Sequence, residues 1–117
     1  DDILAESIKR NERDGITGLL AYDQFNFMQV LEGEEDAVNR LYLGITADPR
    51  HQDVRLIQYE QIDHHQFDDW AMALAKLPEV PGNYINKLYG GFKPQLFSTR
   101  DALIYFNFLR NYLKRAA

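Results

Sequence analysis

Residues 25–32, Phe-Asn-Phe-Met-Gln-Val-Leu-Glu, constrain the fold most, because their alternation predicts a β-strand with an amide on its apolar face. Side chains two residues apart point to the same side of a sheet. The face expected to be buried here contains Phe25, Phe27, Gln29 and Leu31. Burying an amide costs about 1–3 kcal/mol unless it is hydrogen-bonded. Gln29 therefore needs a polar partner, which is either protein backbone or a ligand.

Composition narrows the class of protein. A chain of 117 residues, 45% of them hydrophobic, suits one globular domain with a sizeable core. The net charge of −5 disfavours binding to nucleic acid or to anionic membranes. The absence of cysteine excludes disulfides, thiolate zinc sites and a cysteine nucleophile, and favours a cytoplasmic location. No apolar run approaches the ~20 residues that span a bilayer.

The periodicity predicts an α+β fold in which two helices accompany a sheet. The first helix carries Asn11 at the end of its apolar stripe and ends near Asp14, because Gly15 suits a left-handed terminal residue. The expected elements after it are a hairpin of strands 16–22 and 25–31, a helix from about residue 34 to Pro49, and strands 54–62 and 70–74.

The remaining sequence predicts a helical tail. Residues 84–89 form a short helix that Gly90 and Gly91 interrupt, and Ser98 with Asp101 resembles a capping box for a final helix. Apolar residues cover more than one stripe of that last helix, so it is expected to bury both sides.

Four separated segments together resemble the BLUF domain, a flavin-based blue-light sensor. They are residues 11–20 (NERDGITGLL), 27–33 (FMQVLEG), 48–51 (DPRH) and 67–72 (FDDWAM), in the order found in that family. The resemblance covers residues 1 to about 76 and implies a ferredoxin-like mixed sheet with two helices on one face. It divides the chain into a flavin-binding domain, 1–76, and a helical C-terminal extension, 77–117. That extension is similar to the tail of short BLUF proteins, which signal through partner proteins and are not enzymes.

The resemblance also implies a site for a non-covalently bound flavin, FAD or else FMN or riboflavin. Asn11 would hold the ring, and Gln29 would act as the switch by reversing the hydrogen bonds that it offers to flavin N5 and O4. Trp70 and Met72 would sense that change and pass it to the tail. The other expected cofactor contacts are apolar jaws at Ile3 and Ile45 and a polar group near the ribityl and phosphate chain, formed by Asp48, Arg50 and His51.

One departure from the family concerns the start of the sequence. BLUF photochemistry uses a tyrosine on a first strand upstream of the first helix, and this sequence has no such strand. We therefore expect the natural protein to extend beyond Asp1. The implied partners are further copies of the chain, in a homo-oligomer, and a downstream signalling protein.

Simpler interpretations remain open for each residue taken alone. Asn11 could be a helix-terminal residue, Trp70 and Met72 ordinary core, and Arg50 with His51 a complement to the helix dipole. His64 and His65 suit a solvated loop without a metal, and residues 32–36 suit a helix start better than a calcium loop. For the whole chain, the alternatives are a light-independent BLUF-like interaction scaffold and a small hydrolase. The hydrolase ranks low, because the sequence offers no nucleophile with a base and no phosphate loop.

Overall fold

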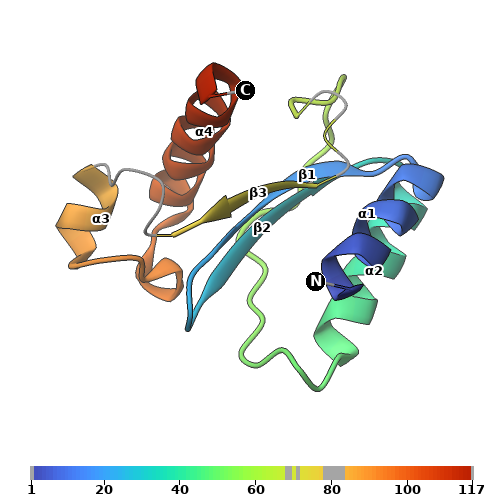
Figure 1. Ribbon diagram of the computed structural model, residues 1–117, viewed down its shortest axis with the longest axis horizontal. Helices are drawn as coiled ribbons and strands as arrows, with labels where there is room; N and C mark the ends of the chain where they lie inside the picture. The colour runs from blue at the N-terminus through green and yellow to red at the C-terminus, as the bar shows by residue number, and fades with distance from the viewer. Residues whose placement is uncertain (1, 68–69, 71, 78–83, 117) are drawn as a thin grey trace. The chain divides into compact units, whose positions relative to one another are not determined.

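The computed structural model describes residues 2–67, 70, 72–77 and 84–116. In chain order the elements are α1 (Asp2–Asp14), β1 (Thr17–Tyr22), β2 (Phe27–Glu32), α2 (Glu35–Ala47), β3 (Ala73–Lys76), α3 (Tyr84–Tyr89), the 3₁₀ turn η1 (Pro94–Leu96) and α4 (Thr99–Ala116) (Figure 1). The strands form one mixed sheet in the order β2-β1-β3, in which β1 and β3 are parallel. The predicted α+β class is confirmed.

The chain divides into two compact units. The first contains residues 1–18 and 31–72, and the second contains residues 19–30 and 73–117. The expected boundary after residue 76 stays a prediction.

In the first unit, α1 ends where the sequence predicts. Gly15 has a φ of 70°, a left-handed conformation that residues with a Cβ adopt at a cost. The Ile16 amide then donates to the Asn11 carbonyl at 2.8 Å, which satisfies one of the last acceptors of the helix. This ending directs the chain from α1 into β1.

The second helix of this unit, α2, packs by its apolar stripe. Ala37 and Leu41 are buried against Ile16, and Leu31 and Ile45 pack on the edge of that cluster. Glu35 and Asp36 lie in the first turn, where negative charge complements the positive end of the helix. The predicted helix between residue 34 and Pro49 is thus confirmed.

The predicted strand 54–62 is wrong. None of these residues is in a strand, and Figure 1 shows them in the irregular segment that follows α2. Three of its apolar side chains are exposed, with 52% for Leu56, 52% for Tyr59 and 40% for Ile62, while Val54 and Ile57 are half-buried. A segment with strand-forming residues becomes a strand only where a neighbouring strand supplies ladder hydrogen bonds, and the described sheet contains only β1, β2 and β3.

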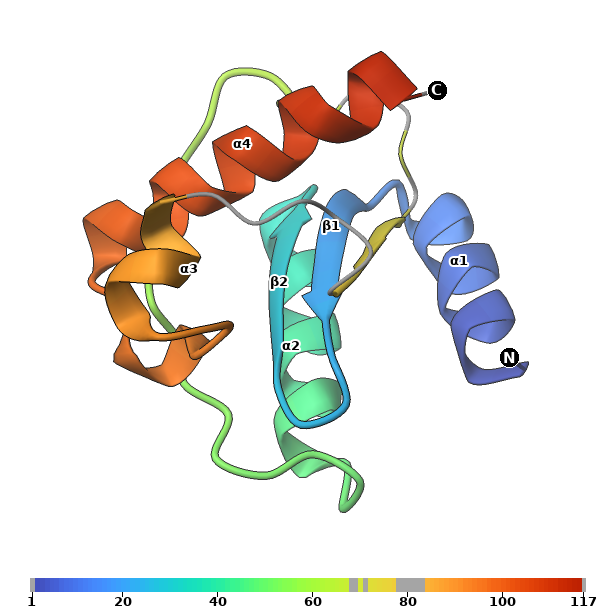
Figure 2. The ribbon, with the colours of Figure 1, turned by 60° about the vertical axis from the view of Figure 1, so that its left-hand side comes forward.

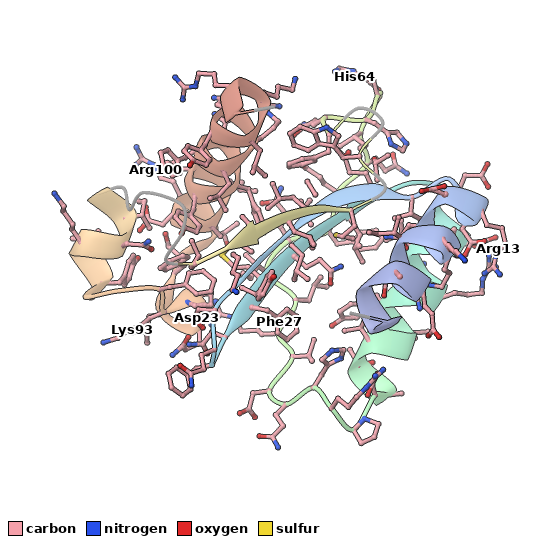
Figure 3. The ribbon with its side chains drawn as sticks, in the orientation of Figure 1. Arg13, Asp23, Phe27, His64, Lys93 and Arg100 are labelled. Carbon is pink, nitrogen blue, oxygen red and sulfur yellow. The ribbon has the colours of Figure 1, made fainter. Side chains whose placement is uncertain are left out.

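In the second unit, Asp23 forms the turn between β1 and β2 (Figures 2 and 3). Its Oδ1 accepts hydrogen bonds from the amides of Phe25 and Asn26, both at 2.8 Å, and the Asp23 amide donates to the Asn26 carbonyl. This turn holds Phe25 outside β2 with 82% of its surface exposed, so the expectation that Phe25 is a buried strand residue is wrong. Asn26 in turn donates its side-chain amide to the Phe92 carbonyl at 3.4 Å.

The face of β2 predicted to be buried is only half-buried. Phe27, Gln29 and Leu31 have intermediate exposure, whereas Met28, on the opposite face, is 4% exposed. The alternation therefore fixes the period of the strand correctly, but it does not identify the face that is covered more completely.

The strand predicted at 70–74 begins later, as β3 at Ala73. Its register runs from Leu19 opposite Ala73 to Tyr22 opposite Lys76. The Leu77 amide extends this pairing by donating to the Tyr22 carbonyl at 2.8 Å. Trp70 and Met72 thus precede β3 and do not share a strand face within it.

The predicted tail helices are confirmed as α3 and α4. Ser98 caps α4, since its Oγ accepts the Asp101 amide at 3.0 Å, and Gly90 and Gly91 both have positive φ. The core of this unit contains Ile85, Phe97, Ala102, Tyr105 and Leu109.

The expectation that α4 buries both sides is wrong. Its buried stripe consists of Ala102, Tyr105 and Leu109, while Leu103 is 47% exposed and Phe106 and Phe108 are half-buried. No helix among the described residues is long and apolar enough to cross a membrane.

Candidate functional site

Asn11 lies on the inner side of the last turn of α1 and is 0% exposed. Its main-chain carbonyl accepts the Ile16 amide, so the backbone is fixed by the helix ending. The side-chain Oδ1 is buried and receives no hydrogen bond from the described residues, although Asn11 forms other interactions. A buried amide at this point offers both a donor and an acceptor to a planar polar group.

Ile45 adds an apolar surface in the same unit. It is half-buried and packs against the cluster of Ile16, Ala37 and Leu41. Ile3 lies in α1, but its side chain is outside the part of the chain that the structure describes. Of the two apolar side chains expected on either side of the flavin ring, the structure therefore describes only that of Ile45.

Asp48, Arg50 and His51 form a tight turn after α2. The Arg50 amide and Nε both donate to Asp48 Oδ1 at 2.9 Å, and the guanidinium continues to Oδ2. These hydrogen bonds hold the pKa of the Asp48 carboxyl far below its ordinary range and raise the pKa of Arg50. The Arg50 guanidinium, expected to meet a phosphate, is thus folded onto its neighbour, with 58% of its side chain exposed.

His51 is oriented by the helix that precedes it. Its Nδ1 lies 3.0 Å from the Ile45 carbonyl oxygen, which can only accept, so Nδ1 carries the hydrogen of this bond. Its backbone amide donates to the Asp48 carbonyl at 3.0 Å. The imidazole is therefore held beside the last turn of α2, next to Ile45.

Gln29 lies in the middle of β2 and belongs to the second unit, whereas the other predicted contacts belong to the first. Its side chain is half-buried, and the residue interacts with other parts of the chain. Both its strand neighbours in sequence, Met28 and Val30, point to the opposite face. Its amide is consequently presented on the half-buried face of β2.

Trp70 and Met72 lie between the irregular segment and β3. The Trp70 amide donates to the Phe67 carbonyl at 3.0 Å, and the Trp70 carbonyl accepts the Gly18 amide at 2.9 Å. The two rings, of Phe67 and Trp70, lie with their centroids 6.4 Å apart. Trp70 is half-buried and Met72 is 8% exposed, and residues 68, 69 and 71 of the same motif lie outside the described residues.

Glu32 was not among the predicted site residues, because the acidic residues within 32–36 were interpreted as a helix start. It is instead the last residue of β2 and is 5% exposed. Its carboxylate accepts hydrogen bonds from Thr17 Oγ1 at 3.0 Å, from the Gln66 amide at 2.8 Å and from the Phe67 amide at 3.0 Å. The signal in the sequence was that Met28, Val30 and Glu32 share one strand face.

The histidine pair lies in the loop before Phe67. His64 and His65 are both exposed, and Figure 3 shows His64 projecting from that loop. The Nδ1 of His65 contacts Thr17 Oγ1. Among residues 2–67, 70, 72–77 and 84–116, no three His, Asp or Glu side chains are grouped so that they could hold a metal ion.

Comparison with known proteins gives one consistent result. Residues 1–73 match the family BLUF, described as sensors of blue-light using FAD. The chain is 36% identical over 74 residues to the photoactivated adenylate cyclase subunit beta of Euglena gracilis. These 74 residues cover 62% of this chain and 9% of that protein. The chain therefore spans only a small part of this curated relative.

Two solved structures are similar over most of the chain. The ground state of BlsA superposes with a TM-score of 0.79 at 30% identity, covering 93% of this chain and 73% of that one. The dark state of BlrB, a BLUF protein, superposes with a TM-score of 0.67 at 30% identity, covering 99% of this chain and 82% of that one. These similarities include the helical tail and support the predicted ferredoxin-like fold.

Proposed function

Because this chain belongs to the BLUF family of blue-light sensors that use FAD, we propose that it is a photoreceptor that binds a flavin non-covalently and reports blue light through Gln29. The single observation that carries this proposal is the family match over residues 1–73, which includes Asn11, Gln29, Trp70 and Met72. The matched family is described as one of sensors, and we propose that this chain is a sensor and not an enzyme.

The donor set of the first unit fits a flavin chemically. The buried Asn11 amide can accept from the ring imide N–H and donate to the neighbouring carbonyl, which satisfies two groups with one side chain. Ile45 supplies an apolar surface of the kind that flat ring systems require, and Ile3 is proposed to do the same. Arg50 and His51 supply local positive and polar groups on a chain of net charge −5.

Gln29 is suited to switching by the chemistry of its side chain. A carboxamide carries a donor and an acceptor on one carbon, so its rotation or tautomerisation reverses what it offers without moving the backbone of β2. A bound flavin supplies the absorption of blue light and the excited-state chemistry. Gln29 converts the result into a changed hydrogen-bond pattern, and Trp70 and Met72 sense that change.

We propose FAD as the flavin, since the family is described as using it, with FMN or riboflavin as the alternatives. Residues 1–76 form the flavin-binding domain and residues 77–117 the extension that passes on the signal. The relative in Euglena gracilis is named as a photoactivated adenylate cyclase subunit, so a segment similar to this chain occurs in a longer protein named for an effector activity. For this chain we propose signalling to a separate partner protein, from a homo-oligomer in the cytoplasm.

The test is to purify the protein with flavin present, to identify the bound flavin after heat release by chromatography, and to record absorption before and after blue illumination. The proposal predicts a yellow protein with FAD at about one per chain and a reversible red shift. A protein that binds flavin without a shift would favour a light-independent scaffold. A protein that takes up no flavin would contradict the binding proposal.

A further inference from the structure

Glu32 is not among the proposed flavin contacts, but its side chain connects three parts of the first unit. Thr17 at the start of β1, the end of β2 and the Gln66–Phe67 amides all converge on its carboxylate. Gln66 and Phe67 lie 34 and 35 residues further along the chain than Glu32. A carboxylate that is 5% exposed and accepts three hydrogen bonds forms a stiff connection.

The direction of each bond in this cluster follows from its chemistry. A carboxylate oxygen only accepts, so Thr17 must donate its hydroxyl hydrogen to Glu32 Oε1. The same hydroxyl can then only accept from His65 Nδ1, which therefore carries a hydrogen. We define His65, Gln66 and Phe67, bound in this way to Thr17 and Glu32, as the carboxylate clamp.

The clamp continues directly to Trp70. Phe67, held by Glu32 through its amide, accepts the Trp70 amide through its carbonyl at 3.0 Å, and its ring packs beside the indole. Phe67 is itself only 4% exposed, so its side chain is closely packed and a shift of its backbone is felt by the neighbouring indole. Trp70 is thus connected to the Glu32 carboxylate through Phe67, by two hydrogen bonds of the Phe67 backbone and one contact between the two rings.

We propose that Glu32 is a positioning residue of the photoreceptor, which holds Trp70 half-buried in the dark state through the carboxylate clamp. This inference rests on the proposed function only in assigning the arrangement to the dark state of a photoreceptor. The hydrogen bonds of the clamp belong to the chain itself. Without the carboxylate, the amides of Gln66 and Phe67 lose their acceptor, and we expect the Trp70 side chain to become more exposed to solvent. Trp70 is the only tryptophan in the chain, so its fluorescence reports its environment alone.

The experiment compares three flavin-loaded full-length proteins in the dark by acrylamide quenching of tryptophan fluorescence. They are the parent, Glu32→Gln and Glu34→Gln. Glutamine keeps the size of Glu32 but replaces one acceptor oxygen by an NH₂ donor, so it cannot accept all three bonds. The control removes the same charge from exposed Glu34, whose side chain forms no cap hydrogen bond.

The proposal predicts that the quenching constant rises about twofold in Glu32→Gln, as expected for a locally opened segment, and not in Glu34→Gln. It also predicts that Glu32→Gln keeps its flavin, and that the rate of dark recovery after blue light changes more than in the control. A quenching constant equal to that of the parent would overturn the proposal.

A second pair of variants decides the case in which Glu32→Gln does not fold. Thr17→Val removes one of the three donors and should raise the quenching constant by a smaller amount, while Thr17→Ser keeps the hydroxyl and should match the parent. Equal quenching of the two would contradict the clamp. If the parent itself shows no red shift, the photoreceptor proposal fails, but the quenching comparison still tests the role of Glu32.

Discussion

The hydroxyl of Tyr89, at the end of α3, donates a hydrogen bond to Asp101 Oδ2 in the first turn of α4 at 2.6 Å. The Ser98 amide lies 3.5 Å from the same hydroxyl oxygen, and Ser98 Oγ accepts the Asp101 amide. The expected capping box therefore closes through a tyrosine and not by direct contact of Asp101 with the Ser98 amide. Because α3 and α4 belong to one unit, this contact joins the two helices of the tail.

Replacement of Tyr89 by Phe should destabilise the tail. A hydrogen bond to a charged group contributes about 1.5–3 kcal/mol, and its loss also leaves a half-buried carboxylate with one donor fewer. Urea unfolding followed by circular dichroism measures the change. Tyr112→Phe removes the same hydroxyl from a tyrosine of α4 whose ring stacks on Phe108, and this change should have a smaller effect. An equal loss of unfolding free energy in the two variants would show that the hydrogen bond of Tyr89 to Asp101 does not stabilise the tail more than an ordinary tyrosine hydroxyl does.

Leu109 anchors the buried stripe of α4 and is 0% exposed. Leu109→Ala should lower the free energy of unfolding by about 2–5 kcal/mol, because it removes buried methyl groups and leaves a cavity. Leu103→Ala makes the same change at a position with 47% exposure and should cost less than about 1 kcal/mol. The comparison is made by urea midpoints. Similar midpoints for both variants would refute the assignment of the buried stripe.

The Asp48–Arg50 pair should contribute to stability in a pH-dependent way. Arg50 lowers the pKa of the folded Asp48 carboxyl, so its contribution is present above the unfolded pKa and is lost as the pH falls through the folded one. Thermal unfolding of the parent and of Asp48→Asn should therefore differ by a constant amount between pH 7 and pH 5, and the difference should shrink only below about pH 4.

The Asp48 pair is exposed enough for solvent to weaken it, and the effect on stability should be small. A double-mutant cycle with Arg50→Gln isolates the interaction from other effects of each change. A difference that grew as the pH fell would contradict the assignment, as would an interaction energy of zero at pH 7.

Asn11 should be needed for flavin affinity. Asn11→Leu keeps the branched shape of the side chain but removes its donor and acceptor, so flavin should bind about 10- to 100-fold more weakly, as expected for the loss of one or two hydrogen bonds. Titration of the flavin-free protein measures the affinity. Asn107→Leu, on the exposed side of α4, is the matched control and should bind as the parent does. Unchanged affinity in a folded Asn11→Leu protein would remove Asn11 from the site.

The local features of this fold were predictable from the sequence because their causes are local. The end of α1 depends on Gly15, and the ends of the tail helices depend on Gly90 and Ser98, each within a few residues of the feature it controls. The burial of Asn11 followed from its place on the apolar stripe of α1. The turn formed by Asp48 and Arg50 is also local, but the sequence analysis gave Arg50 to a ligand without considering this nearer partner.

The features that were predicted wrongly depend on partners distant in sequence. A strand such as the one predicted at 54–62 needs a neighbouring strand, and the local sequence does not say whether one is present. Glu32 was interpreted as part of a helix start because acidic residues follow it. Its burial depends instead on hydrogen bonds from amides 34 and 35 residues further along the chain. Phe25 fits the alternation of β2, but the hydrogen bonds of Asp23 place it in the turn.

The central claim is that the amide of Gln29 changes its hydrogen bonding to the flavin on illumination. Its most direct test is the light-minus-dark absorption difference spectrum of Gln29→Leu, recorded beside the parent and beside Gln24→Leu, which makes the same change at an exposed residue of the hairpin turn. The account predicts that all three proteins are yellow, that the parent and Gln24→Leu show the same red shift, and that Gln29→Leu shows none. A red shift of parental size in Gln29→Leu would contradict it.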